Sequence, residues 1–321
     1  MDIDRWLHQP FLDDTFPLPL DAPFTLTGAR RAGLPRHWLK LLSEGGQLRH
    51  PVKGCYVPAQ LPDDIRTRAS CLRLVAPADA VVVDRHAGWL LGADMVLLPN
   101  EHLNLLPIQM YLPAGRGRLR NKLCESGERN FRTEDVTEVH GVRITTALRT
   151  ALDLGRHRWP EQALTALDAL HRLGHFSVEE LVEEVGRFKR MRWVTTLRTV
   201  APRTDGRSQS GGETVIRWRW LHLPIPPPQS QVEVRHGGRL AFIDVGNAEV
   251  RGGVEFNGVK WHDAPTDRAK DAKRAEWLDQ DADWVLEWLV SADVYGPGAR
   301  VEQAIMDVHR EALARTRRRT P

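Results

Sequence analysis

Two acidic residues in the last third of the chain lie in short apolar stretches that are typical of strands. Asp244 ends the stretch Leu240-Ala-Phe-Ile-Asp244, and Glu255 lies in Val254-Glu-Phe-Asn-Gly-Val-Lys-Trp-His262. Period-two alternation places each carboxylate on the inward face of its strand, and residues 247–251 form the expected turn between them. A hairpin with aligned faces would point both carboxylates at one site, where their oxygens could hold Mg²⁺. Such a site predicts phosphodiester cleavage, because a bound cation polarises a phosphoryl oxygen and activates water.

Glu213 is a third candidate ligand for the same cation. Turn residues 208–212 lead into an expected helix over 214–221, so Glu213 would lie in its first turn. A second helix is expected from Pro265, and Trp284-Val-Leu-Glu-Trp-Leu-Val290 is typical of a buried strand. Taken singly, each carboxylate has an ordinary structural role open to it, such as ending a strand or facing solvent. Their joint order favours a shared site.

This order of helix, hairpin, helix and strand, over about residues 205–315, resembles the endonuclease-like domain related to very short patch repair enzymes, within the PD-(D/E)xK nuclease superfamily. The matching residues are Glu213, Asp244, Glu255, Gly258, Trp261, His262 and the helix 267–274. The resemblance implies a restriction-endonuclease-like α/β fold with Mg²⁺ held by Asp244, Glu255 and Glu213.

One departure from the family pattern concerns the base that activates water. Relatives carry an aspartate, or a histidine base, where this chain has Asn257. An amide is a poor proton acceptor, so a general-base contribution of roughly 10²–10⁴-fold is in question. Lys260 and His262 are the candidate substitutes. The predicted catalytic set is therefore Asp244, Glu255, Asn257, Lys260, His262 and Glu213.

A second signal lies near the N-terminus. Residues 24–33 and 34–42 are typical of two short helices that meet at a glycine turn, with Ala29 and Ala32 packing on Trp38, Leu41 and Leu42. Gly45 and Gly46 end the second helix, and residues 48–56 suit a two-stranded wing. Outward basic side chains would then meet the DNA groove and phosphates; they are Arg30, Arg31, Arg36, His37, Lys40, Arg49 and Lys53.

Residues 24–58 resemble the winged helix-turn-helix at the start of AbiEi-family antitoxins, where a Gly-Leu helix entry and a Gly-x-Tyr wing end recur. The alternative is a small subdomain used for protein contact. Further along, 140–153 closely resembles the corresponding AbiEi-like segment, and it predicts a strand that runs into a helix capped by Thr145 or Thr146. Arg149 and Asp153, four residues apart, predict an ion pair on that helix.

The remaining middle region predicts short strands at 81–83, 96–98 and 110–112, helices over 160–200, and a linker over 202–212. With 41% hydrophobic and 27% charged residues, the composition is that of a soluble globular protein. No apolar run approaches the roughly 18 residues of a membrane span, and no signal peptide is recognised, so we expect a cytoplasmic protein. Cys55, Cys71 and Cys124 favour neither disulfides nor a zinc site.

The sequence thus predicts a multidomain α/β protein. Its expected parts are a winged helix-turn-helix (1–60), an α/β region with a helical connector (61–204) and an endonuclease-like domain with a basic tail (205–321). Double-stranded DNA is the expected partner, and the AbiEi resemblance implies a nucleotidyltransferase-like toxin as another. Three functions remain open: a DNA-binding regulator with an inactive nuclease fold, an active Mg²⁺-dependent endonuclease in defence or repair, and an antitoxin that contacts only protein.

Overall fold

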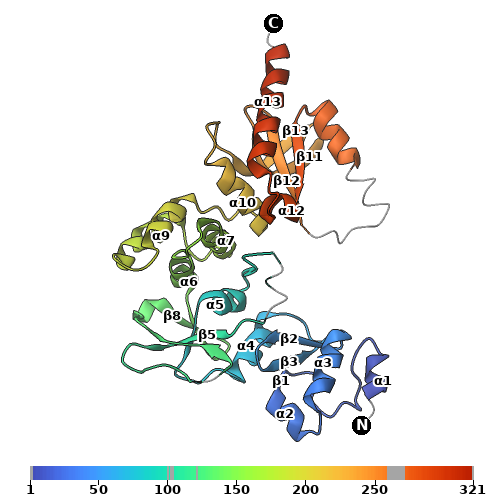
Figure 1. Cartoon of the computed structure of the whole chain (residues 1–321), viewed down its shortest axis with the longest axis vertical. Helices are drawn as coiled ribbons and strands as arrows, with labels where there is room; N and C mark the ends of the chain where they lie inside the picture. Colours follow the sequence, from blue (N-terminus) through green and yellow to red (C-terminus); the bar gives the residue numbers. More distant parts are fainter. Residues whose placement is uncertain (1–2, 100, 102–104, 121, 259–271, 320–321) are drawn as a thin grey trace. The chain divides into compact units, whose positions relative to one another are not determined.

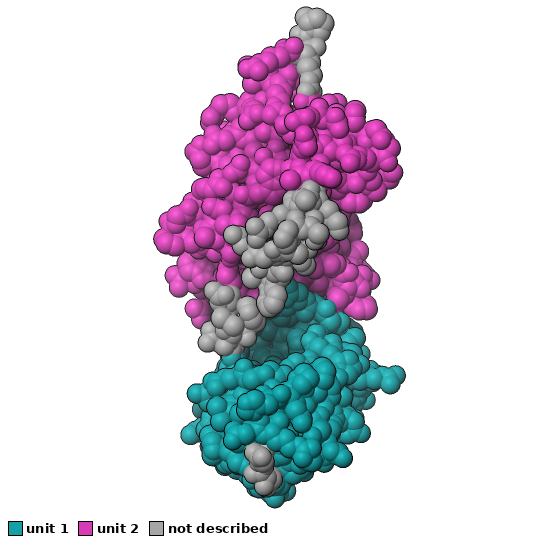
Figure 2. All heavy atoms as spheres, turned by 90° about the vertical axis from the view of Figure 1, so that its right-hand side faces the viewer, with its two compact units in different colours: residues 1–95, 102–154 teal, residues 96–101, 155–321 magenta. Residues whose placement is uncertain are grey.

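The computed structural model describes residues 3–99, 101, 105–120, 122–258 and 272–319. Within it the chain divides into two compact units, one of residues 1–95 and 102–154 and the other of residues 96–101 and 155–321 (Figure 2). Both units mix helices with strands, which confirms the mixed α/β class. The region expected to form one middle part, 61–204, is thus divided between the two units.

The first part of unit 1 combines three helices with a small antiparallel sheet of order β1-β3-β2 (Figure 1). Its elements are α1 (Ile3–Leu7), β1 (Phe24–Thr25), α2 (Leu26–Arg31), α3 (Arg36–Glu44), β2 (Leu48–Val52) and β3 (Cys55–Pro58). The Thr25 side chain accepts a hydrogen bond from the amide of Gly28 at 3.0 Å and so caps α2. Apolar side chains from these elements form one core; they include Trp6, Phe16, Phe24, Ala29, Leu34, Leu39, Leu42 and Tyr56.

The prediction that Leu41 packs inward is wrong. Its side chain is 41% exposed, whereas Leu39 and Leu42 are fully buried. Residues three apart on a helix share a face, so Leu39 and Leu42 define the inner face of α3 and Leu41 lies outside it.

A six-stranded sheet organises the rest of unit 1, in the order β6-β5-β4-β9-β8 with β7 paired to β5. Its elements are α4 (Ile65–Arg73), β4 (Val81–Val82), α5 (Asp84–Leu91), β5 (Ile108–Pro113), β6 (Cys124–Glu125), β7 (Glu128–Arg129), η2 (Thr133–Asp135), β8 (Val136–Val139), β9 (Val142–Thr145) and α6 (Ala147–Leu154). The expected strand over 96–98 is absent, because the amides of Leu97 and Leu98 donate to the Glu101 carboxylate rather than to a neighbouring strand. The strand-to-helix prediction over 140–153 is confirmed, with Thr146 accepting from the amide of Arg149 at 3.3 Å.

Unit 2 begins with a helical layer and continues into a four-stranded sheet of order β10-β11-β12-β13. The helical elements are α7 (Pro160–His171), α8 (Val178–Glu184), η3 (Val185–Phe188), α9 (Val194–Val200), η4 (Ala201–Arg203) and α10 (Gly211–Trp220). The later elements are β10 (Gln229–His236), β11 (Arg239–Asn247), β12 (Gly252–Asn257), helical residues 272–276 with the π-helical turn η5 (Trp277–Asp281), β13 (Val285–Val290), α12 (Ser291–Tyr295) and α13 (Val301–Arg319).

Two apolar clusters flank this sheet. One joins α10, α12 and α13 to Val245, Val254 and Leu289, and the other joins Trp277 and Leu278 to the strands β10 and β11. Strands β10, β11 and β12 are antiparallel, and β13 is parallel to β12. The sheet therefore has helices on both sides, and the N-terminus of α10 lies close to the centre of the sheet.

The expected linker, residues 202–212, is tied to α7 by one buried carboxylate. Asp168 is fully buried, and its oxygens accept from the Asp205 amide at 2.8 Å, the Thr214 hydroxyl at 2.8 Å and the Arg217 guanidinium at 2.7 Å. Burial raises the pKa of Asp168, and the Arg217 charge opposes this rise. The segment before α10 is thus held in place, which fixes where α10 begins.

Among the described residues, no helix is both long enough and apolar enough to cross a bilayer.

We expect Arg217→Met to destabilise the protein by about 3–5 kcal/mol, because it leaves the buried Asp168 carboxylate without its counter-charge. Urea denaturation of the full chain measures the loss. The matched control is Arg207→Gln, which removes an arginine paired with Asp205 but 62% exposed; it should cost about 1 kcal/mol or less. A loss below that of the control would contradict the role given to Arg217.

Candidate functional site

Asp244 of β11 and Glu255 of β12 lie on neighbouring strands, one register position beyond the pair Val245 and Val254. The ladder between β11 and β12 ends at that pair, so Asp244 and Glu255 follow it where the two strands separate. The Asp244 carboxylate accepts the backbone N–H of Phe256 at 2.9 Å, which ties its side chain across to β12. The structure therefore brings the two predicted carboxylates together.

Glu213 reaches the same place from α10. Ser210 caps this helix by accepting from the Glu213 amide at 3.2 Å, so Glu213 lies in the first turn, as predicted. Its carboxylate accepts a hydrogen bond from the Gln209 amide at 2.7 Å, and Glu213 as a whole is only 5% exposed. Burial raises the pKa of Glu213, and the nearby Asp244 carboxylate raises it further. The three acidic side chains thus form one electrostatically coupled cluster.

Gln231 of β10 links two of these carboxylates, and sequence reasoning missed it. Its amide nitrogen donates to Glu213 at 3.1 Å and to Asp244 at 3.2 Å. The residue has a φ of +51°, a left-handed conformation that is uncommon for a side chain other than glycine. Strained residues of this kind gather at functional sites. Nothing in the sequence signals this feature, because a glutamine within an alternating strand is ordinary.

Arg274 forms an ion pair with Glu255, the third carboxylate of the cluster. Its guanidinium forms a two-pronged ion pair with Glu255, at 2.7 and 2.8 Å, and also donates to the Phe242 carbonyl at 2.7 Å. Burial raises the pKa of Glu255 and Arg274 opposes the rise, while Asp244 adds to it. The sequence predicts a helix over 267–274, which ends at Arg274, but gives no sign of the partner of this arginine.

The donor atoms of this cluster fit a hard divalent cation in type. Three carboxylates offer oxygen ligands, as Mg²⁺ requires. Their arrangement is already satisfied by other groups, however, since Gln231 bridges Glu213 to Asp244 and Arg274 occupies both oxygens of Glu255. Within the described part of the chain, no three His, Cys, Asp or Glu side chains are grouped as metal ligands.

The remaining predicted catalytic residues are not part of this cluster. Asn257 is exposed at the end of β12, opposite Val290 of β13. Lys260 and His262 lie outside the described residues.

In unit 1, most of the predicted DNA-binding side chains are exposed. Arg30 and Arg31 end α2, and Arg36, His37 and Lys40 lie on the outer side of α3. Lys40 has only a 3.6 Å ion pair to Glu44, between two side chains that are 76% and 60% exposed. These cations can therefore approach an external partner at low cost in lost contacts.

The two wing residues differ from each other. Lys53 lies at the turn between β2 and β3 and is half-buried. Arg49 does not fit the expected phosphate contact, because its guanidinium donates to the Leu61 carbonyl and its Nε is buried without a partner.

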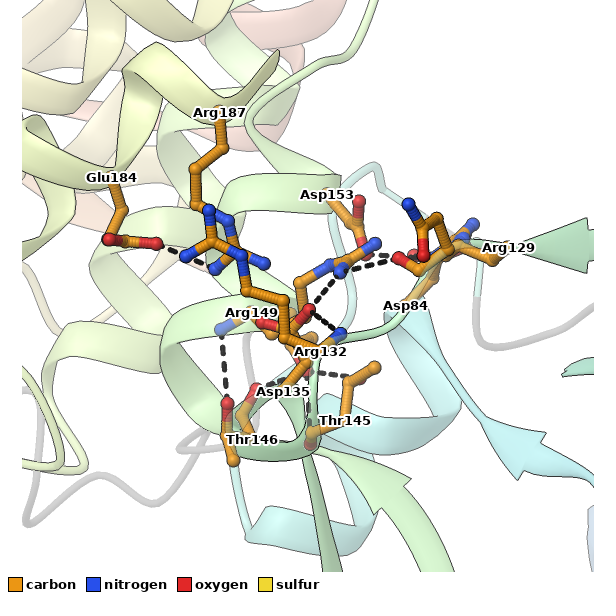
Figure 3. Close-up of polar contacts among 12 residues, drawn as sticks. Asp84, Arg129, Arg132, Asp135, Thr145, Thr146, Arg149, Asp153, Glu184 and Arg187 are labelled. Carbon is orange, nitrogen blue, oxygen red and sulfur yellow. Dashed lines mark hydrogen bonds and ion pairs between the residues drawn. The ribbon is translucent and has the colours of Figure 1, made fainter. Parts of the chain in front are cut away.

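A buried ion network surrounds the strand-to-helix segment 140–153 (Figure 3). Arg129 pairs with Asp84 at 2.7 Å and with Asp153 at 2.9 Å, while Arg149 pairs with Asp153 at 2.8 Å and with Asp135 at 2.5 Å. The predicted pair of Arg149 and Asp153 is thus confirmed. Burial alone would lower the pKa of Arg129, but Asp84 and Asp153 more than offset this effect and raise it. The network joins α5, α6, β7 and η2, which is a structural role.

Comparisons with known proteins give relatives without an assigned activity. No family model matches the chain. The uncharacterized proteins MT2308 (strain CDC 1551 / Oshkosh) and Rv2248 (strain ATCC 25618 / H37Rv) of Mycobacterium tuberculosis are each 26% identical over 215 residues, or 67% of this chain and 78% of the relative. The crystal structure of the RV2827C protein from Mycobacterium tuberculosis is 15% identical, covers 63% of this chain and 76% of that chain, and has a TM-score of 0.29.

We expect Gln231→Met to destabilise the protein by about 1–3 kcal/mol at pH 7, because Glu213 and Asp244 lose their shared donor. The pKa of Glu213 should rise further, since the Gln231 hydrogen bond lowers it. A carboxyl group whose pKa is higher in the folded than in the unfolded protein does not lower the free energy of unfolding at a pH below its unfolded pKa. As the pH rises from the unfolded pKa through the folded pKa, it lowers that free energy increasingly. Denaturation should therefore show a smaller deficit at pH 5 than at pH 7. Gln229→Met, exposed at the start of the same strand, is the control; a deficit independent of pH would refute the coupling.

Proposed function

We propose that this protein binds double-stranded DNA through unit 1 and carries a nuclease-type domain with a divalent-cation site in unit 2. The observation that carries this proposal is the convergence of Glu213, Asp244 and Glu255 from one helix and two strands. Three carboxylates brought together partly out of water cost free energy, and a structural role needs no such arrangement.

The DNA-binding half of the proposal is supported by the order of elements in unit 1. The helices α2 and α3 are separated by four residues and followed by the hairpin of β2 and β3. In a winged helix-turn-helix the second helix enters the major groove and the wing contacts the backbone. Arg36, His37 and Lys40 lie on the exposed side of α3, where base edges and phosphates would be met.

The nuclease half is supported by the order of elements in unit 2. The helix α10, the β11–β12 hairpin, the helical residues 272–276 and the parallel strand β13 follow the order on which the resemblance to PD-(D/E)xK enzymes rests. Asp244, Glu255 and Glu213 would hold Mg²⁺ in this domain. When bound, the cation supplies charge neutralisation at a phosphoryl oxygen and a water ligand of lowered pKa.

The chain's own residues would orient that chemistry. Phe256 holds the Asp244 carboxylate through its backbone N–H, and Gln231 fixes the separation between Asp244 and Glu213. The exposed Asn257 offers an amide where a base is expected, so proton removal would fall to another group, with Lys260 and His262 as the candidates.

A second candidate function is a DNA-binding, AbiEi-antitoxin-like regulator that does not cut. The Asn257 amide favours it, because this side chain cannot act as a general base. In that case unit 2 would serve as a platform for nucleic acid or protein, and a nucleotidyltransferase-like toxin would be the expected partner.

For DNA binding, we expect Arg36→Ala plus Lys40→Ala to weaken affinity for duplex DNA roughly tenfold or more, because phosphate and base contacts are lost. The slope of log affinity against log salt should fall by about 1 for each lost phosphate contact. Fluorescence anisotropy across a salt series measures both. Lys189→Ala plus Arg198→Ala removes the same charge from exposed positions of unit 2 and should leave binding unchanged. Equal binding by the two double variants would refute the α3 assignment.

For cleavage, we expect Mg²⁺- or Mn²⁺-dependent cutting of plasmid or single-stranded DNA that chelator stops and Asp244→Ala abolishes. Glu233→Ala, which removes a carboxylate from the same sheet outside the cluster, is the control and should cut normally. If Asn257 stands in for a lost base, Asn257→Asp should increase cutting; if Lys260 or His262 is the base, alanine at that residue should reduce cutting roughly 10²-fold or more. Equal cutting by the wild type and Asp244→Ala would indicate that another site cuts the DNA. No cutting under any condition would favour the second candidate function, the regulator that does not cut.

A further inference from the structure

Arg274 and a divalent cation require the same atoms. The guanidinium of Arg274 engages both oxygens of Glu255, one at 2.7 Å and one at 2.8 Å. A two-pronged arginine–carboxylate pair is among the stronger polar contacts in proteins, and it uses one lone pair on each Glu255 oxygen. A cation that approaches Glu255 while this ion pair is intact therefore meets the positive charge of Arg274 and only the remaining lone pairs of the carboxylate.

The two partners differ in how readily they can separate. The Arg274 side chain is 36% exposed, whereas that of Glu255 is 10% exposed. A released guanidinium can be rehydrated by rotation towards solvent, but Glu255 remains among buried groups and keeps its need for a positive partner. The site can therefore accommodate a change in which another cation replaces Arg274 as the positive partner of Glu255.

The charge balance of the cluster also favours exchange of Arg274 for a divalent cation. Glu213, Asp244 and Glu255 carry three negative charges when ionised, and Arg274 is the positively charged side chain that the described contacts bring to them. A divalent ion would neutralise more of this charge than one guanidinium. It could also approach Asp244 and Glu255 together, whereas the described contacts of Arg274 with these carboxylates are those to Glu255.

We infer that Arg274 is a built-in competitor of the metal ion: it neutralises Glu255 in the resting protein, and a divalent cation binds by displacing it. This inference rests on the proposed cation site and adds a control on its occupancy. The opposite assignment, in which Arg274 positions Glu255 for the metal, predicts the reverse effect of removing it. The sign of the change in metal affinity therefore decides between them.

The test is Mn²⁺ binding to the full-length protein, measured by calorimetry without DNA. Arg274→Gln should bind Mn²⁺ at least about tenfold more tightly than the wild type, because a competing charged contact is gone. Arg274→Lys keeps the charge without the two-pronged geometry and should fall between them. Arg300→Gln is the matched control: Arg300 is 43% exposed and also pairs with carboxylates, Glu287 and Asp293, that are not in the cluster.

A second readout covers loss of stability in the variant. Without metal, Arg274→Gln should have a lower Tm than the wild type, because buried Glu255 has lost its partner, and Mn²⁺ should raise its Tm more than that of the wild type. Terbium luminescence adds a local signal, since Trp288 lies opposite Glu255 across the β12–β13 ladder and can sensitise a bound ion.

The outcomes separate the inference from the proposed function. Tighter binding by Arg274→Gln that Asp244→Ala abolishes supports both. Equal or weaker binding by Arg274→Gln, with wild-type binding still lost in Asp244→Ala, overturns the competition and leaves the cation site standing. Absence of Mn²⁺ and Tb³⁺ binding in the wild type and in folded Arg274→Gln overturns both.

Discussion

The buried carboxylate of Asp168 is the contact on which the candidate site of unit 2 depends. It joins α7, the segment before α10 and α10 itself, through Asp205, Thr214 and Arg217. A charge in this position is costly unless every oxygen is satisfied, so the alternatives to the observed arrangement are high in free energy. The start of α10, and with it Glu213, is thereby placed against the sheet with little freedom.

The acidic cluster illustrates how a protein keeps like charges together in the absence of a ligand. Gln231 donates to two carboxylates at once, and Arg274 neutralises the third. Each of these contacts costs free energy of folding. Gln231 adopts a left-handed backbone conformation, and the guanidinium of Arg274 is partly buried. Such costs are tolerated where the acidic groups have a use beyond stability, and this is the physical reason to regard the cluster as functional.

Much of this arrangement could be predicted from local patterns. The strand pattern of residues 240–257 gave the two strands that carry Asp244 and Glu255, and the turn residues before α10 gave the place of Glu213. The prediction that Asp244 lies on an inward face is wrong, because Leu240 and Phe242, which alternate with it, are 50% and 45% exposed. The partners of these residues could not be predicted, because they depend on tertiary contacts. Gln231 acts through an irregular backbone, and Arg274 is brought to Glu255 from 19 positions along the chain. The same limit explains why the strand predicted over 96–98 is absent: the backbone amides of Leu97 and Leu98 donate to the Glu101 carboxylate instead of to a neighbouring strand.

Gly212 lies where the first turn of α10 packs on Phe256 of β12. A side chain at this position would overlap the ring of Phe256, so a larger residue here requires that ring or the helix to move. The next residue along the helix is Glu213, and the residue before Phe256 is Glu255. A larger residue at position 212 would therefore press on the Phe256 ring, so the packing of α10 on β12 and the spacing of the acidic groups beside it would change together.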